Sequence, residues 1–285
     1  MAAVSGEETV VKGTRLAGKV AIVTGGGSSG ELVGTGQAAA ILFARQGARV
    51  LVVDRDSANA GETVATIEAE GGQASLLEAD VTDSEACQAM ADSVVARYGA
   101  LNILFNNVGL GGPRATVVEV DEEAWDQTLK ANLKSTMLAS KYAIPKMIEA
   151  GGGSIINIAS VDGIRAGVWE NVPYAAAKGA IVNLTSHMAV HHGRDNIRVN
   201  SIAPGMIHAP FVSSIPPQLR ELRRRGSPLG IEGTAWDVAW AGVFFASDES
   251  RYISGVTMAV DGGLLAATPL SMRFHLGFGE GRGQQ

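Results

Sequence analysis

The sequence contains little cysteine and proline, and each shortage excludes a class of protein. Cys87 is the single cysteine among 285 residues, which rules out an internal disulfide framework and a zinc site built from several cysteines. Only 9 prolines accompany 36 glycines. Because those glycines follow no three-residue period, the chain is neither a collagen nor a low-complexity protein.

Long apolar runs and basic clusters are also missing. No apolar run approaches the roughly 20 residues of a membrane-spanning helix. The N-terminal segment has Glu7 and Glu8 in place of the apolar core of a signal peptide. The formal net charge is -6, without a basic stripe that would attract nucleic acid. We therefore expect a reduced, cytoplasmic protein that binds neither membranes nor nucleic acid.

What the sequence does contain is an alternation of two kinds of segment. Short apolar runs rich in β-branched residues predict strands, and stretches of ten to fifteen residues between them predict helices. This alternation indicates an α/β fold, with a single doubly wound parallel sheet covered by helices on both faces. The expected strands are 19–23, 49–53, 74–78, 102–105, 154–158, 197–201 and 256–260. The expected helices are 37–45, 57–70, one opened by a capping box at 82–85, one after Asp121, 174–190 and 234–246.

No linker divides this alternating series, so we expect one domain over 18–263 that includes a substrate loop at 208–230. A loose leader would precede it at 1–17, and a glycine-rich tail would follow at 264–285.

A glycine-rich segment joins the first expected strand to the first expected helix. Glycines at such a place let the backbone approach a pyrophosphate at the positive end of a helix. Asp54, at the end of the second strand, would accept hydrogen bonds from ribose hydroxyls and repel a 2′-phosphate, although Arg55 beside it could receive one. We therefore expect NAD rather than NADP. The segment contains Gly25, Gly27, Ser28, Gly34, Thr35 and Gly36.

Six motifs in order give the chain a resemblance to the short-chain dehydrogenase/reductase family, whose sheet is of the Rossmann type. The resemblance covers about 16–263. The motifs are Thr24-Gly25, Asp80-Val81, Asn106-Asn107-Val108-Gly109, Ser160, Tyr174-x-x-x-Lys178 and Pro204-Gly205.

The resemblance implies a catalytic set of Asn132, Ser160, Tyr174 and Lys178. Tyr174 would be the general acid/base, Ser160 would hold the substrate oxygen, and Lys178 would hold the nicotinamide ribose. Asn132 would bind a water that links Lys178 to solvent. A free tyrosine has a pKa of about 10. We therefore expect the ammonium of Lys178, on the same helix face, and the positive nicotinamide to lower the pKa of Tyr174.

The resemblance also implies further cofactor contacts at the ends of other strands. Asp80 and Val81 would bracket the adenine, Asn107 and Gly109 would line the adenosine side, and Pro204, Gly205 and Ile207 would hold the carboxamide. Two features depart from the family pattern. Eight residues separate Gly25 from Gly34, an apparent insertion of five, and Ala209 stands where the family often has threonine.

The substrate would contact variable segments, and Asp162, Trp169, Met206 and Phe211 are its candidate partners. Apolar residues among these segments suggest a mainly apolar alcohol or ketone, cyclic or aromatic. The arginines at 220 and 223–225 are expected on a solvated helix face rather than in a carboxylate clamp. We expect no metal, because the pair His187 and His191 lacks the glutamate of a His-Glu-x-x-His zinc helix.

Together these features predict an NAD(H)-dependent oxidoreductase that interconverts a secondary alcohol and a ketone. Two alternatives stay open, an NADPH-dependent ketone or acyl reductase and a catalytically idle nucleotide-binding protein of the same fold. The resemblance further implies a homo-oligomer, either a tetramer or a dimer. The apolar residues of the tail, such as Leu270 and Phe274, separately suggest that the tail docks on a neighbouring subunit.

Overall fold

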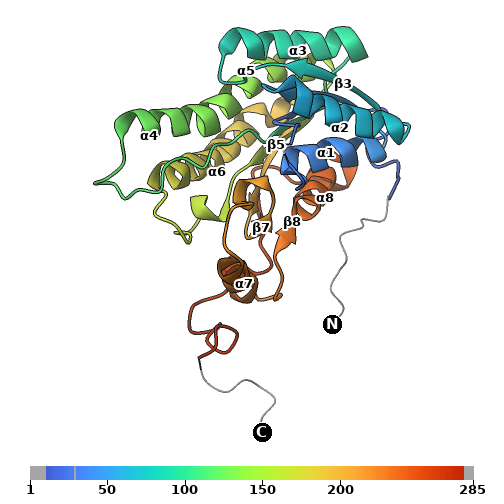
Figure 1. Cartoon of the computed structure of the whole chain (residues 1–285). Coiled ribbons are helices and arrows are strands. Elements are labelled where there is room, and N and C mark those ends of the chain that lie inside the picture. Colours follow the sequence, from blue (N-terminus) through green and yellow to red (C-terminus); the bar gives the residue numbers. More distant parts are fainter. Residues whose placement is uncertain (1–10, 29, 279–285) are drawn as a thin grey trace.

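A parallel sheet of seven strands forms the centre of the molecule (Figure 1). The computed structural model describes residues 11–28 and 30–278. The strand order is β3-β2-β1-β4-β5-β6-β9, and every neighbouring pair is parallel. This arrangement confirms the predicted doubly wound α/β fold. The strands are β1 Val20–Thr24, β2 Arg49–Asp54, β3 Gln73–Glu78, β4 Ile103–Asn106, β5 Gly153–Ile158, β6 Ile197–Pro204 and β9 Thr257–Val260.

Helices cover both faces of this sheet, because successive residues of a strand point to opposite sides. On β1, Ala21 and Val23 join a buried cluster with α1, α2 and α8. Val20 and Ile22 join a second cluster with α3, α5 and α6. The helices are α1 Thr35–Arg45, α2 Ser57–Ala69, α3 Ser84–Tyr98, α4 Glu122–Leu129, α5 Ser135–Glu149, α6 Val172–His192, α7 Pro217–Gly226 and α8 Ala235–Ala246. No helix of the described residues is long and apolar enough to cross a membrane.

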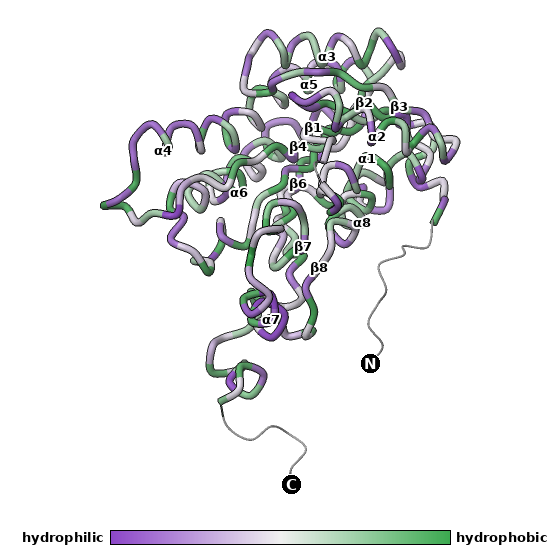
Figure 2. Tube along the Cα trace, viewed as in Figure 1, coloured by the Kyte–Doolittle hydropathy of each residue, from purple (hydrophilic) through white to green (hydrophobic). Residues whose placement is uncertain are grey.

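A small second layer lies beside the sheet, below it in Figure 1. The strand β7 (Ile207–His208) pairs in parallel with β8 (Gly233–Thr234), and α7 lies in the chain between them. The segment 208–230 therefore contains a helix. Figure 2 shows α7 as strongly hydrophilic, whereas the central strands are mostly hydrophobic.

The start of α3 differs from the predicted capping box at 82–85. Asp83 is the N-cap, and its carboxylate accepts a hydrogen bond from the backbone of Ala86 at 2.8 Å. Thr82 instead donates its backbone N–H to Asp80 at 2.9 Å. A capping box does form at α8, where Thr234 and Asp237 bond each other reciprocally.

The expectation of a loose leader is wrong for residues 11–17. Leu16 is fully buried in the core, and its N–H donates to the carbonyl of Gln46 at 2.9 Å. Gly13 likewise donates to the carbonyl of Arg45 at 3.0 Å. Residues 1–10 lie outside the described residues, as does Ser29 within the insertion.

The described part of the tail, 264–278, contacts its own chain. Arg225 of α7 donates to the carbonyl of His275 at 2.7 Å, and Arg165 donates to the carbonyl of Ala267 at 2.9 Å. Met272 is buried, whereas Leu270 is exposed. The tail therefore packs beside α7 and the segment after β5.

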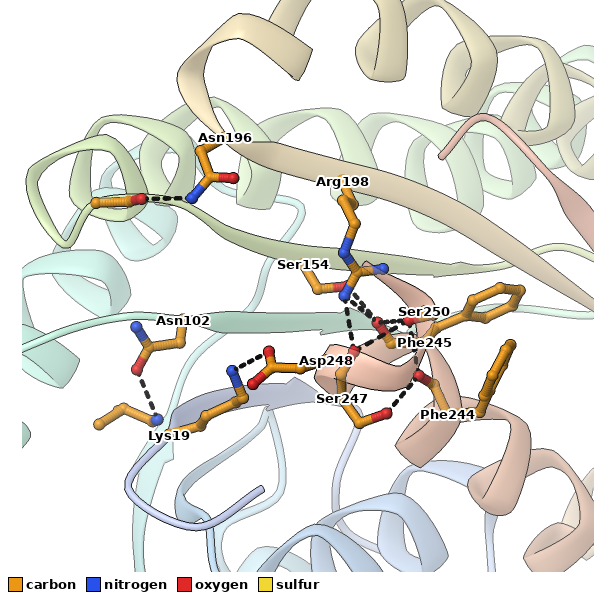
Figure 3. A network of polar contacts seen from close by, with 12 residues as sticks. Lys19, Asn102, Ser154, Asn196, Arg198, Phe244, Phe245, Ser247, Asp248 and Ser250 are labelled. Atoms are coloured by element: carbon orange, nitrogen blue, oxygen red, sulfur yellow. Dashed lines mark hydrogen bonds and ion pairs between the residues drawn. The ribbon is translucent and has the colours of Figure 1, made fainter. Parts of the chain in front are cut away.

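A polar network closes the amino-terminal edge of the sheet (Figure 3). Arg198 at the start of β6 donates to the carbonyls of Phe245 at 2.7 Å and Ser247 at 3.2 Å, which lie at the carboxyl end of α8, where carbonyls have no partner within the helix. Lys19 pairs with Asp248 at 2.8 Å just beyond that helix. These contacts fix α8 at one edge and leave the carboxyl edge for a site.

The close approach of α1 to the end of β1 gives a testable prediction about stability. A Cβ atom at Gly36 would lie 1.9 Å from the carbonyl oxygen of Gly25. We expect Gly36→Ala to lower the free energy of unfolding by about 1–3 kcal/mol through overpacking, measured by urea denaturation.

The matched control is Gly61→Ala in α2, where the nearest atom to the new Cβ lies 3.9 Å away. That variant should be neutral or stabilised by up to about 1 kcal/mol. An unchanged midpoint for Gly36→Ala would contradict the tight contact.

Candidate active site

A cleft of about 860 Å³ opens over the carboxyl ends of the strands. Its lining follows β1, β2, β4, β5 and β6, as represented by Gly25, Asp54, Asn107, Ser160 and Pro204. The strand order reverses between β1 and β4, which is where open parallel sheets bind ligands. The volume is typical of a site for a small molecule or cofactor.

Every residue predicted for cofactor, catalysis or substrate lines this cleft except Asn132, which is buried behind it. The fold therefore brings together residues from segments more than 180 positions apart in the sequence, from Gly25 to Phe211. Their individual roles stay predictions.

The glycine-rich segment forms a closed backbone loop. The N–H of Gly26 donates to the carbonyl of Val53 at 3.2 Å, and the Asn107 side chain donates to the carbonyl of Gly25 at 3.0 Å. Ser28 donates its hydroxyl to the carbonyl of Leu32 at 2.9 Å. The loop lies against the start of α1, since a Cβ at Gly36 would collide with the carbonyl of Gly25.

Asp54 is held at the end of β2 by two backbone N–H groups. One carboxylate oxygen accepts from Gly27 at 3.0 Å and the other from Asp56 at 3.1 Å. The same carboxylate therefore fixes the glycine loop and presents a negative charge to the cleft. Arg55 and Asp56 beside it are exposed and also line the cleft.

Asp80 lies on the same side of the cleft, after β3. Its carboxylate accepts a hydrogen bond from the N–H of Thr82 at 2.9 Å. That bond holds the pKa of Asp80 below its usual value, so the group is ionised at neutral pH.

Tyr174 and Lys178 lie on α6, one turn apart, at the other end of the cleft. The Lys178 Nζ lies 5.6 Å from the centre of the Tyr174 ring. It donates to the carbonyl of Ile158, at the end of β5, at 2.8 Å. Ser160 lies two residues after the end of β5, and a hydrogen bond with its side chain acts to lower the pKa of Tyr174.

Burial outweighs that hydrogen bond and raises the pKa of Tyr174 to about 12, with a further increase from the charge of Asp162. Burial also lowers the pKa of Lys178 to about 7. In the surroundings that the chain itself provides, the pKa of Tyr174 is therefore raised, and its lowering by Lys178 together with the positive nicotinamide stays a prediction. The physical reason is that desolvation penalises the charged form of both groups.

Asn132 lies in a π-helical turn, Lys130–Lys134, between α4 and α5. Its side chain donates to the carbonyls of Leu110 at 2.8 Å and Thr128 at 2.9 Å. A Cβ at Gly109 would lie 2.9 Å from the Asn132 Oδ1 and 3.4 Å from the Lys178 Nζ. The absence of a side chain at Gly109 thus lets Asn132 and Lys178 approach one another. Such π turns often occur at functional sites.

Three loops converge on Tyr174 at the predicted substrate end. Phe211 packs on Tyr174 with ring centres 5.9 Å apart. Arg114 lies over the Trp169 ring at 3.8 Å from its centre. An isolated β-bridge between Ala115 and Asn171 joins the loops after β4 and β5. Of these contacts, the Phe211 ring provides an apolar wall beside the phenol.

The expectation that the arginines of α7 lie on a solvated helix face is wrong for Arg223. This side chain is buried and lines the cleft. Its Nε donates to Glu232 at 2.6 Å, and an Nη donates to the carbonyl of Ile207 at 3.0 Å. Arg220 bonds the other Glu232 oxygen at 3.0 Å. The spacing of three between these arginines puts them on one helix face, but their partner lies beyond the helix.

The residues at the two ends of the cleft fit a dinucleotide. A Cβ at Gly36 would collide with the carbonyl oxygen of Gly25, and a Cβ at Gly25 would press on the Asn107 side chain at 3.0 Å, so the loop has room for backbone only. The Asp54 carboxylate is one polar end, and Tyr174 with Lys178 is the other. No group of three or more metal-ligating side chains occurs in the part of the chain that the structure describes.

Known proteins resemble this chain over most of its length. A family model described as "Enoyl-(Acyl carrier protein) reductase" matches residues 30–265. The uncharacterized oxidoreductase YxbG of Bacillus subtilis is 40% identical over 262 residues, which are 89% of this chain and 93% of that protein. The 2,5-dichloro-2,5-cyclohexadiene-1,4-diol dehydrogenase LinX of Sphingobium indicum is 37% identical, with 87% and 97% covered.

A solved structure is also similar to this chain. It is a 7α-hydroxysteroid dehydrogenase complexed with NADH and 7-oxo glycochenodeoxycholic acid. It superposes with a TM-score of 0.82 at 34% identity and covers 88% of this chain and 95% of its own.

The buried ion pair between Arg223 and Glu232 predicts a local effect on stability. Glu232→Gln removes the charge that faces two arginines and leaves Arg223 buried without its counterion. We expect the free energy that holds α7 in place to fall by about 3 kcal/mol. Limited proteolysis followed by mass spectrometry would measure the expected faster cleavage within 208–230, the segment that contains α7.

Glu221→Gln is the matched control, because Glu221 forms an exposed pair with Arg224 on the same helix. Its proteolysis rate should equal that of the unaltered chain. Equal rates for both variants would show that Glu232 does not hold this segment.

Proposed function

From the premise that the chain belongs to the short-chain dehydrogenase/reductase family and is an oxidoreductase of alcohols or ketones, we propose a more specific function. The protein interconverts a secondary alcohol and a ketone with NAD as its cofactor. The observation that carries this proposal is the position of Ser160, Tyr174 and Lys178 at one end of the cleft, with Asp54 anchored at the other.

NAD would supply the hydride chemistry when bound. The backbone of the glycine loop and the amino end of α1 would bind its diphosphate. Asp54 would bind the adenosine ribose. The remaining contacts would come from Asp80, Val81, Asn107, Gly109, Pro204, Gly205, Ile207 and Lys178.

The protein's own part in the reaction is to hold and move one proton. Tyr174 exchanges a proton between its hydroxyl and the substrate oxygen, and Ser160 orients that oxygen with a hydrogen bond. Lys178 is held at the phenol through its bond to the carbonyl of Ile158 at 2.8 Å. Asn132, buried next to Lys178, would position the water by which the proton reaches solvent.

Replacing the phenol tests the proposed mechanism. Tyr174→Phe keeps the ring and its contact with Phe211 but removes the proton that is exchanged. We expect kcat to fall by about 10²–10⁴-fold, measured as NADH formation from secondary alcohols, while NADH binding followed by fluorescence is retained.

Tyr142→Phe is the control for loss of a phenolic hydroxyl. Tyr142 bonds Ser84 at 2.7 Å outside the cleft, so turnover should be unchanged. Full turnover in Tyr174→Phe would refute the assigned role.

The choice of NAD rests on the charges around the end of β2. Asp54 and Asp56 are two carboxylates against one guanidinium, that of Arg55. Because Asp54 is fixed by backbone bonds at 3.0 and 3.1 Å, it cannot swing away from an incoming 2′-phosphate. Repulsion between the two anions would disfavour NADP.

Removing the charge of Asp54 should therefore weaken this selection. For Asp54→Asn, we expect the ratio of kcat/KM for NAD to that for NADP to fall by about tenfold or more, which corresponds to about 1.4 kcal/mol. Asp56→Asn is the control, because its carboxylate caps α2, and it should change the ratio less. A preference of the unaltered protein for NADP would overturn the proposal.

Arg55 favours a second candidate function, that of an NADPH-dependent ketone or acyl reductase. Arg55 is exposed and lines the same end of the cleft, where it could receive a 2′-phosphate. The comparison of the two cofactors decides between these candidates. A catalytically idle protein of this fold would bind NADH but oxidise no alcohol.

We also propose that the chain forms a homo-oligomer. Met137 and Ile148 of α5 and Val190 of α6 are large apolar residues on the surface of one chain, which supports association. The choice between a tetramer and a dimer stays a prediction, as does the cytoplasmic location.

A further inference from the structure

Asp162 has a fixed position beside the proposed reaction centre. It lies in a 3-10 turn, Val161–Gly163, that begins directly after Ser160. Its N–H donates to the Ser160 hydroxyl at 3.2 Å. The side chain lines the cleft, and its charge acts on the Tyr174 hydroxyl and raises that group's pKa.

The Asp162 carboxylate differs from the other carboxylates of the cleft because no donor among the described residues bonds to it. Asp54 is held by Gly27 and Asp56, and Asp80 is held by Thr82. Burial raises the pKa of Asp162. A half-buried carboxylate without donors carries a desolvation cost that a hydrogen-bonding ligand would offset.

The surrounding loop leaves the carboxylate no room on its protein side. A Cβ at Gly167 would lie 2.1 Å from an oxygen of Asp162, so the loop backbone passes directly against it. Asn171, from the end of the same loop, also lines the cleft, and its Oδ1 is buried without a partner in the described residues. Most other side chains at this end are apolar, namely Leu110, Val168, Trp169, Met206, Phe211 and Val212.

This arrangement specifies the chemistry of the missing partner. The partner must donate a hydrogen bond to a carboxylate and must lie next to the oxygen held by Ser160 and Tyr174. An anionic group is excluded by repulsion from Asp162. An ammonium brings three N–H donors, whereas the acceptors without a partner among the described residues at this end are the Asp162 carboxylate and the buried Asn171 Oδ1. A hydroxyl brings one donor, which the Asp162 carboxylate alone satisfies.

We propose that Asp162 binds a second hydroxyl group of the substrate, on the carbon next to the reacting carbinol. The substrate class is thus a 1,2-diol with an apolar remainder, and the product is the α-hydroxy ketone. In this step the carbinol carbon gives a hydride to NAD and its hydroxyl gives a proton to the Tyr174 phenolate, whose own proton has already left for solvent, while the second hydroxyl is unchanged. The inference rests on the proposed alcohol–ketone chemistry and adds the substrate class.

The experiment compares cyclohexane-1,2-diol, cyclohexanol and 2-aminocyclohexanol as substrates with NAD. We expect kcat/KM for the diol to exceed that for cyclohexanol by about tenfold or more, the effect of a hydrogen bond to a charged acceptor. In Asp162→Ala this ratio should fall to near one. Glu170→Gln, on the same loop but exposed and outside the cleft, should keep the ratio of the unaltered protein.

A binding measurement keeps the two proposals separable. With NADH present, the diol should raise the thermal midpoint of the unaltered protein more than cyclohexanol does, and Asp162→Ala should lose that difference. Protection by the diol without turnover would refute the proposed function and leave the role of Asp162 intact. Equal protection and equal turnover with diol and cyclohexanol, a preference for the amino alcohol, or a ratio that survives in Asp162→Ala would overturn the diol assignment.

Discussion

The reversal of strand order between β1 and β4 is the constraint on which the rest of this molecule depends. Parallel strands need crossover helices, and winding outward in both directions from one point places those helices on opposite faces. The loops after β1 and β4 then separate and leave a cleft between them. Because all carboxyl ends share one edge, Asp54, Ser160 and Pro204 reach the same cleft from strands far apart in sequence.

The sequence predicts the elements that depend on local patterns and misses those that depend on distant partners. The strand ending at Asp54 is an apolar run followed by an acid, and both features survive in the fold. The burial of Arg223 could not be predicted, because its counterion Glu232 lies beyond α7 and meets it only through the pairing of β7 with β8. The π turn around Asn132 is similarly hidden, since helical residues precede and follow it without a break.

Motif spacing also predicts proximity better than it predicts electrostatics. The separation of four residues correctly places Lys178 beside Tyr174 on one face of α6. It contains no information about how deeply β5 and the following loops bury the pair. Burial then dominates, raising the pKa of Tyr174 to about 12 and lowering that of Lys178 to about 7. Desolvation is a property of the assembled site, so it enters only with tertiary structure.

The carboxylates of the cleft show how one fold uses the same group in two ways. At the end of β2, one backbone N–H holds each Asp54 oxygen, and a similar bond keeps the pKa of Asp80 low, so these charges are fixed parts of the wall. Beside Tyr174, the Asp162 carboxylate has no such donors among the described residues, and burial raises its pKa. A charge that the chain satisfies shapes the site, whereas a charge that it leaves unsatisfied lowers its free energy only through a donor from outside. The contrast places the demand for a ligand donor at the catalytic end of the cleft.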